Sequence, residues 1–298
     1  EQSLEIVRPV WTVDTQMGYY GSGAVSVGDG AYIAFAGDAG ILTVADAKTG
    51  LEKGKVQLDG GVRSAVVEAE GFLWVTTKAG KLYKLSVSGE GAVSVKAEAS
   101  LPDTTVSTPV VADGKVIITG GSFVAGGYLQ VYDLDLKLFA ETHTDAEVKT
   151  PTVTTAYEDL YLYFVQNMTP GGLYVAKVTS DGKIEVTLLH EPEQKNYSMS
   201  NVVADEDGML YYSNDSGYMF ALKPGKEPIV QNPEEKPEEG TTSNGGDTIP
   251  EEQKPSDRKP SGNRRSPQTL QQGKFRNLSF NSGAKRSMQT TEETKTTT

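Results

Sequence analysis

The feature that most constrains the fold of this 298-residue chain is an internal repeat. Each copy opens with Ser or Thr and two or three apolar residues, then passes an acidic or glycine turn into a second strand. A glycine turn leads from the second strand into a third. The five copies begin at Ser22, Ser64, Ser107, Thr150 and Ser200.

The early copies begin roughly 42 residues apart, which is the length of a four-stranded propeller blade. A fourth, outer strand follows four of the copies, at residues 55–58, 93–96, 138–141 and 184–187. The sequence therefore predicts an all-β chain, a propeller of about five four-stranded blades. The fourth copy is longer because residues 166–172 are inserted.

The residue types predict how each strand is buried. The first strand of a copy is almost continuously apolar, so we expect it to be buried between neighbouring blades. The third strand alternates, as at residues 82–85, so we expect one of its sides to face solvent. Acidic-Gly pairs at 70–71, 113–114 and 207–208 predict hairpin turns with positive φ. We expect the same of the glycine before each third strand, at Gly40, Gly80, Gly127, Gly172 and Gly217.

The fifth copy has no outer strand, because Lys223-Pro224-Gly225 breaks the pattern. The segment Glu5–Val13 has outer-strand character, and its Pro9 suits the edge of a sheet. If it pairs with the fifth blade, the ring closes and both sheet edges are protected.

The copy at residues 107–133, Ser-Thr-Pro-Val-Val-Ala-Asp-Gly-Lys-Val and then Gly-Tyr-Leu-Gln-Val-Tyr-Asp, resembles the quinoprotein-like (PQQ-type) β-propeller repeat. The stretches at 155–172 and 210–217 resemble the C-terminal half of exported PQQ-binding-like repeat proteins of Gram-positive bacteria. The resemblance covers residues 4–222. It also implies an alternative, in which the chain is part of a seven- to eight-bladed ring.

The composition changes after Pro224, so we place the propeller at residues 1–224 and a disordered tail at 225–298. The first part of the tail is rich in Pro, Glu and Lys and too poor in apolar residues to fold. Between Arg258 and Arg286 every charged residue is basic, although the whole chain carries a net charge of −12. An acidic propeller repels nucleic acid, so we expect none to bind to it.

The residues offer no visible catalytic or cofactor machinery. The chain has no Cys, and its two histidines, His143 and His190, lie near strand ends or loops and are expected at the surface. Trp11 and Trp74 lie in strand patterns, so we interpret them as blade core and expect no quinone cofactor. The acidic run Asp205–Asp207 is interpreted as a hairpin turn, so no metal site is predicted.

Loops that depart from the repeat are the best candidates for ligand contacts. Tyr and Asn side chains stack on and hydrogen-bond to sugars and peptides. The predicted ligand-binding residues lie in the insertion, before the fifth blade and before the first blade: Asn167, Met168, Asn196, Tyr197, Tyr19 and Tyr20. The alternative is that these segments are only structural bends.

Together these features predict a monomeric, non-catalytic scaffold that binds a protein or carbohydrate ligand at a propeller rim. We expect it to be exported and extracellular or displayed on the cell surface, with its signal peptide outside this chain and no transmembrane segment. Two alternatives stay open: a quinoprotein-like or glycan-active enzyme with an unrecognised central site, and a structural part of a larger surface protein.

Overall fold

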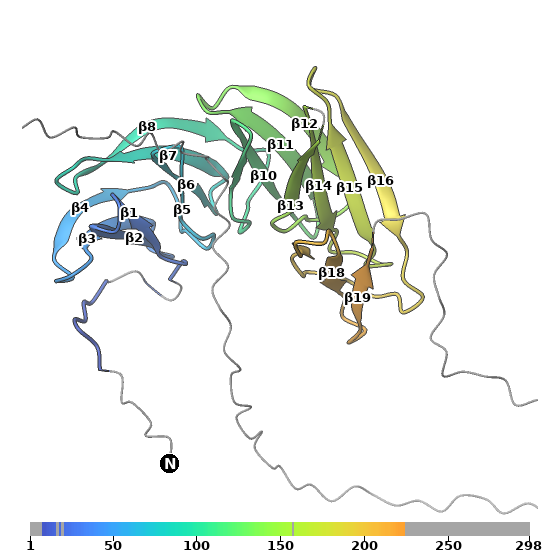
Figure 1. Cartoon of the computed structure of the whole chain (residues 1–298), viewed down its shortest axis with the longest axis horizontal. Helices are drawn as coiled ribbons and strands as arrows, with labels where there is room; N and C mark the ends of the chain where they lie inside the picture. Colours follow the sequence, from blue (N-terminus) through green and yellow to red (C-terminus); the bar gives the residue numbers. More distant parts are fainter. Residues whose placement is uncertain (1–7, 16–17, 19–20, 157, 224–298) are drawn as a thin grey trace, which may run out of the picture. The chain divides into compact units, whose positions relative to one another are not determined.

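A computed structural model describes residues 8–15, 18, 21–156 and 158–223. It is an all-β structure in which four antiparallel sheets have four strands each and a fifth has three (Figure 1). Among the described residues, no helix is long and apolar enough to cross a membrane. The predicted tail at 225–298 lies outside the described residues.

Each sheet is one repeat, so the sheets are called blades 1 to 5 in chain order. Blade 1 holds β1 (Val25–Val27), β2 (Tyr32–Ala36), β3 (Ile41–Asp46) and β4 (Glu52–Gln57). Blade 2 holds β5 (Val67–Ala69), β6 (Phe72–Thr77), β7 (Lys81–Val87) and β8 (Val93–Ser100). Blade 3 holds β9 (Val110–Ala112), β10 (Lys115–Ser122), β11 (Gly126–Asp133) and β12 (Leu138–Thr144).

Blade 4 holds β13 (Thr152–Ala156), β14 (Asp159–Val165), β15 (Leu173–Val178) and β16 (Ile184–His190). Blade 5 holds β17 (Val203–Ala204), β18 (Leu210–Ser213) and β19 (Met219–Leu222). In every blade the strands pair in chain order. The four predicted outer strands are confirmed and extend further than expected.

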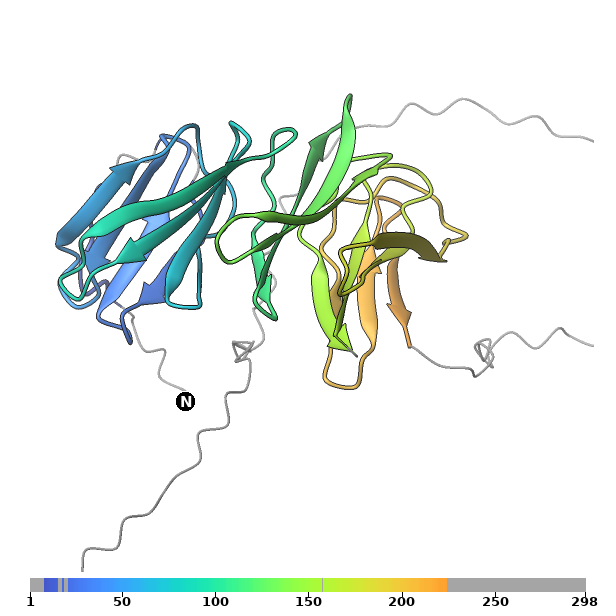
Figure 2. The ribbon, with the colours of Figure 1, turned by 90° about the horizontal axis from the view of Figure 1, so that it is seen from above.

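Antiparallel order places the connections of the chain on two edges of the blades. The turns between first and second strands and between third and fourth strands share one edge, here the hairpin rim. The turns between second and third strands share the other edge with the links from one blade to the next, here the connection rim. Figure 2 shows the blades from above, with turns at both ends of their strands.

The hydrophobic core lies between consecutive blades. Leu42 and Leu73 belong to a cluster shared by blades 1 and 2, and Trp74 and Ile118 to one shared by blades 2 and 3. Blades 3 and 4 and blades 4 and 5 share the other two clusters. Within the described ranges, none of these clusters joins blade 5 to blade 1.

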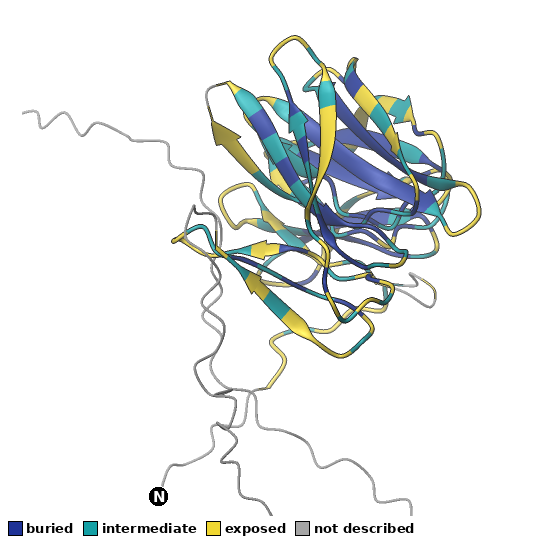
Figure 3. Ribbon diagram, turned by 90° about the vertical axis from the view of Figure 1, so that its right-hand side faces the viewer, coloured by how far each residue is buried: buried dark blue, intermediate teal, exposed yellow. Residues whose placement is uncertain are grey.

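Burial corrects two of the expectations about strands. The first strands, predicted to be buried, are short and half-exposed, whereas the second and third strands of blades 2 and 3 are largely buried, as in β6, β10 and β11 (Figure 3). The third strand β7, predicted to have a solvent side, is buried at four consecutive positions. The reason is that a neighbouring blade packs on each face of the middle strands.

The predicted turns are largely confirmed. Glu70, Gly71, Asp113 and Gly114 have positive φ, whereas only Gly208 of the third pair does. Gly40, Gly80 and Gly217 also have positive φ, as expected. In blades 3 and 4 the preceding glycines, Gly126 and Gly171, take this conformation instead of Gly127 and Gly172.

The Ser/Thr residues that open the repeats join one blade to the next. The amide of Ala65 donates to Thr108 Oγ1 at 3.1 Å, and the amide of Thr108 donates to Thr150 Oγ1 at 2.9 Å. Ser107 Oγ donates to the carbonyl of Val148 at 3.0 Å. Because these partners are one repeat apart, the hydroxyl groups connect blades 2, 3 and 4 at the start of their first strands.

The described part of the predicted closing strand does not form a strand. Residues 8–13 have no strand pairing. The indole of Trp11 lies over Gly50, and a Cβ atom at position 50 would lie only 2.7 Å from the indole ring. Trp11 Nε1 also donates to the carbonyl of Ala47 at 3.0 Å. This tryptophan therefore packs on the third-to-fourth strand turn of blade 1, because its apolar ring and its one donor both find partners there.

Candidate functional site

The connection rim brings together two of the three segments predicted to bind a ligand. Asn167 and Met168 lie in the turn between β14 and β15, and Asn196 and Tyr197 lie in the link between blades 4 and 5. The amide of Asn196 donates to the carbonyl of Pro170 at 3.2 Å, so the two segments are in direct contact. Tyr19 and Tyr20 lie outside the described residues.

The two asparagines have partners inside the protein. Asn167 Nδ2 lies 3.4 Å from Glu147 Oε2, and Glu147 also forms an ion pair with Lys149. Asn196 Oδ1 accepts the amide of Tyr197 at 2.9 Å. Of the four predicted residues in these loops, Tyr197 is the most available to a ligand, since 40% of its residue surface is exposed.

Sequence reasoning missed the turn of blade 3 that lies beside Tyr197. Phe123 is 73% exposed, and its ring centroid lies 6.2 Å from that of Tyr197, with an angle of 35° between the planes. Val124 and Met199, next to these aromatic residues in the chain, are also exposed. We call these four residues the apolar patch. Its signal in the sequence was Phe-Val at the centre of a glycine-rich turn.

Acidic side chains predominate in the connection-rim segments of blades 3 to 5. Asp145, Glu193 and Asp215 are exposed and form no ion pair within the described chain. The lysines of these segments are neutralised, since Lys149 pairs with Glu147 and Lys195 with Glu191. The rim next to the patch therefore carries a net negative charge, which favours a basic partner.

His190 corrects the prediction of two surface histidines. His143 is exposed, but His190 packs at the junction of blades 4 and 5. Its ring meets Tyr212 edge-on and lies 5.6 Å from the ring of Phe220, while Tyr212 and Phe220 stack at 4.8 Å. Burial lowers the pKa of His190 and raises the pKa of Tyr212 to about 12, because both charged forms lose water there.

The other candidate chemistry is accounted for by packing and turns. Trp74 is fully buried and donates from Nε1 to the carbonyl of Ala69 at 3.0 Å, as expected of a core residue. Asp205 accepts the amides of Asp207 and Met209 through Oδ1 and the hydroxyl of Tyr211 through Oδ2, which confirms the hairpin-turn interpretation. No group of three potential metal ligands occurs among the residues that the structure describes.

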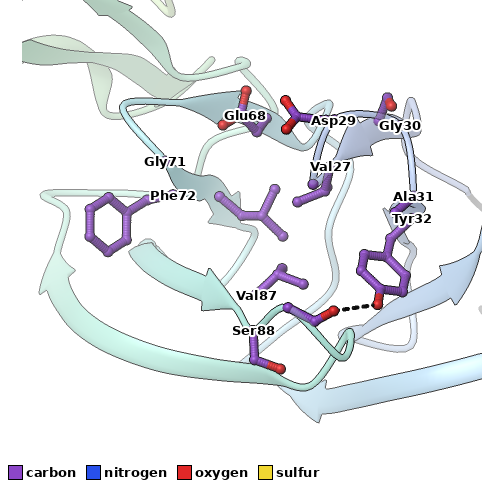
Figure 4. Close-up of a pocket in the computed structure, with 14 residues that line it drawn as sticks. Val27, Asp29, Gly30, Ala31, Tyr32, Glu68, Gly71, Phe72, Val87 and Ser88 are labelled. Carbon is purple, nitrogen blue, oxygen red and sulfur yellow. Dashed lines mark hydrogen bonds between the residues drawn. The ribbon is translucent and has the colours of Figure 1, made fainter. Parts of the chain in front are cut away.

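The hairpin rim carries a separate cleft of about 470 Å³ between blades 1 and 2 (Figure 4). The first-to-second strand turn of blade 1, residues 28–31, forms one wall, and the turn at Ser88 and Gly89 of blade 2 forms another. Tyr32 Oη bridges the two blades by donating to the carbonyl of Gly89 at 2.7 Å.

No family model matches this sequence, and no curated protein matches it. Solved structures do. A quinohemoprotein alcohol dehydrogenase from Comamonas testosteroni matches with a TM-score of 0.53 and 12% identity, over 68% of this chain and 41% of its own. The chain has the fold of the PQQ-repeat β-propellers.

Two further structures are similar. A europium-containing methanol dehydrogenase matches with a TM-score of 0.52 and 13% identity, over 72% of this chain and 51% of its own. BamB from Moraxella catarrhalis matches with a TM-score of 0.40 and 15% identity, over 67% of this chain and 73% of its own. The matched region thus spans about half the length of the two dehydrogenases, and at these identities the likeness concerns the fold alone.

Proposed function

We propose that this propeller is a non-catalytic scaffold that binds a protein partner at the connection rim of blades 3 to 5. The observation that carries the proposal is the contact between Phe123 and Tyr197, two exposed aromatic rings contributed by different segments of the rim. Exposed, clustered apolar side chains with a polar surround are a feature of protein interaction sites.

The chemistry of the partner follows from the charge of the rim. The connection-rim segments of blades 3 to 5 carry carboxylates without an ion pair in the described chain at Asp145, Glu193 and Asp215, and their lysines Lys149 and Lys195 are already paired. A partner segment that combines apolar and basic residues complements both the apolar patch and this charge. The fold itself does not choose between binding and catalysis, since propellers with this repeat include enzymes.

The location of the protein is part of the proposal. We propose that it acts outside the cytoplasm, on the strength of the repeat's resemblance to exported proteins. Protease treatment of intact cells that express the natural protein tests this point: degradation without lysis supports an exposed surface location, and protection until lysis contradicts it.

A peptide-display selection on the full chain tests the binding function. The selected peptides are then measured against wild type, against the double variant Phe123→Ser/Tyr197→Ser, and against Leu51→Ser. Leu51 is a matched control because it is 64% exposed but lies at the turn after β3, on the hairpin rim. We expect peptides rich in basic and apolar residues, bound by wild type and Leu51→Ser and lost by the double variant.

The same proteins are applied to a glycan array. Binding of glycans without selectable peptides would contradict a protein partner. Peptides that bind the double variant as well as they bind wild type would contradict the assignment to the apolar patch.

A further inference from the structure

The cleft on the hairpin rim between blades 1 and 2 has negatively charged walls. Asp29 and Glu68 are its carboxylates, and its lining among the described residues includes no Lys or Arg. In Figure 4 these carboxylates lie on one side, Tyr32 and Ser88 on other sides, and the apolar Val27 and Val87 between them.

The corresponding place between blades 2 and 3 is occupied by a lysine of the protein itself. Lys84 Nζ lies 4.0 Å from the ring centroid of Phe72 and donates to the carbonyl of Leu134 at 2.7 Å. Asp135 lies 3.8 Å from the same ammonium group. Because Lys84 is only 8% exposed, its charge is held by a ring, a carbonyl and a carboxylate.

The place between blades 3 and 4 also holds a lysine, which comes from a different strand of the repeat. Lys115 Nζ lies 4.9 Å from the ring centroid of Phe139. The remaining cavity there is about 120 Å³, and its lining includes Asp113 and Glu158. Two consecutive blade junctions on this rim therefore hold a lysine of the protein itself next to an aromatic ring, Lys84 from a third strand and Lys115 from the start of a second strand.

The repeat register shows that blade 1 supplies the ring without the cation. Tyr32, Phe72 and Lys115 occupy equivalent positions in blades 1, 2 and 3. Each is the first residue of the second strand, and each pairs with the last residue of the first strand. Gly89 and Leu134 are also equivalent. The turn between the third and fourth strands opens at Ser88 in blade 2 and at Asp133 in blade 3, and Gly89 and Leu134 are the residues that follow. Both carbonyls accept a hydrogen bond, from Tyr32 Oη and from Lys84 Nζ respectively.

Lys53 lies close to blade 2 but does not line the cleft. The stem of Lys53 packs beside Gly91, outside the residues that line the cleft. Its positive charge is one of the causes that lower the pKa of Asp46, on another turn of blade 1.

We propose that the cleft between blades 1 and 2 binds the alkylammonium group of an external ligand, at the place where the next junction holds Lys84. The ammonium group would donate to the carboxylates of Asp29 and Glu68 and lie next to the ring of Tyr32. Val27 and Val87 would contact the methylene chain. This site is on the opposite rim from the apolar patch and does not depend on the proposed function.

Calorimetric titration of the full chain with cadaverine tests the proposal. We expect one cadaverine per chain, and an affinity about tenfold weaker in Asp29→Asn/Glu68→Gln, because charged hydrogen bonds are lost. Asp113→Asn is the matched control: Asp113 and Asp29 both have positive φ, at 50° and 52°, in equivalent turns. It should leave the affinity unchanged.

A second variant fills the cleft from within. Ala31 is exposed beside Tyr32, and Ala31→Lys should supply the missing ammonium group and abolish cadaverine binding while the unfolding temperature is kept. Parallel titrations use pentanol, calcium chloride and N-acetyl-lysine methylamide. Binding of the lysine derivative together with cadaverine indicates a peptide side chain as the source, and binding of cadaverine alone indicates a free diamine.

Three results would overturn the proposal. One is no binding of cadaverine up to about 10 mM. Another is equal binding of pentanol or preference for calcium, since neither carries an alkylammonium group. The third is unchanged affinity in Asp29→Asn/Glu68→Gln when its unfolding temperature matches that of wild type.

Discussion

Tyr212 Oη lies 2.6 Å from Nδ1 of His190 and joins the second strand of blade 5 to the outer strand of blade 4. Tyr212 is 1% exposed, so this contact lies inside the junction of the two blades. It is the only hydrogen bond that the Tyr212 hydroxyl makes with another described side chain. The junction therefore depends on a polar contact as well as on apolar packing.

Tyr212→Phe should lower the free energy of unfolding by about 1 kcal/mol, because it removes one buried hydrogen bond and leaves the His190 nitrogen without its partner. Urea unfolding of the full chain measures the change. Tyr211→Phe is the control: Tyr211 donates to Asp205 at 2.8 Å at an exposed site, so its loss should be smaller. Equal losses in the two variants would show that the buried contact adds nothing.

The stability of the protein should fall as the pH is lowered through the His190 titration. Burial lowers the pKa of His190 below the usual 6.5, so the unfolded chain binds a proton more readily than the folded one. The contribution is complete above pH 6.5 and is lost as the pH falls toward the lowered pKa. Thermal unfolding between about pH 7.5 and 5 should show this slope in wild type. His190→Gln should reduce it and His143→Gln should not.

A second acid-dependent step should come from the ion pair between Arg63 and Asp38. Arg63 Nε and Nη2 each donate to one carboxylate oxygen at 2.9 Å, and this hydrogen bonding lowers the pKa of Asp38 below 3.8. The stabilisation is therefore present above pH 3.8 and lost as the pH falls through the lowered pKa. Arg63→Lys should lower the unfolding temperature at neutral pH, because lysine cannot donate in this two-point geometry. An unchanged temperature would contradict a stabilising role.

Trp74→Ala should cost about 3–5 kcal/mol, because a fully buried indole is replaced by a cavity between blades 2 and 3. Trp11→Ala should cost less, since Trp11 is half-exposed and packs on a single turn. Chemical unfolding of both variants measures the difference. A larger loss of unfolding free energy in Trp11→Ala than in Trp74→Ala would contradict this prediction. It would mean that the contact of Trp11 with blade 1 stabilises the protein more than the buried Trp74 does.

Thr108→Val should weaken the connection between blades 2 and 3 by about 1 kcal/mol, because Ala65 loses the acceptor of its amide. Thr155→Val is the control, since Thr155 is exposed on β13. Hydrogen exchange at the Ala65 amide reads the contact directly and should become faster in Thr108→Val alone. Unchanged exchange would show that this hydroxyl does not protect the amide.

The exposed rings of Phe123 and Tyr197 lead to a prediction that can be tested without a binding partner. Phe123→Ser should leave the free energy of unfolding within about 0.5 kcal/mol of wild type, because Phe123 contacts solvent more than protein. It should also reduce binding of a hydrophobic dye. Val10→Ser, at a residue that is 88% exposed, is the matched control for dye binding. A strongly destabilised Phe123→Ser would mean that the patch is structural.

Much of the fold was predictable because it is local. The turns at Glu70-Gly71 and Asp113-Gly114 require positive φ. The outer strand predicted at residues 93–96 follows the third strand of its repeat in the chain, and it extends to Ser100 in the structure. The site was predictable only in part. Asn196 and the 166–172 insertion, both predicted to contact a ligand, do meet, but Phe123 lies more than 70 positions from Tyr197, and no periodicity relates the two.

The repeat by itself determined the number, order and pairing of the strands, because hairpins form between neighbours in the chain. Tertiary structure alone decided which faces are buried, since that depends on the blade packed beside each sheet. It made β7 buried on both sides and placed His190 against Tyr212. It also decided which junction holds its own lysine and which stays open. Lys84 reaches Leu134, 50 residues away, and this contact exists only once two blades have docked.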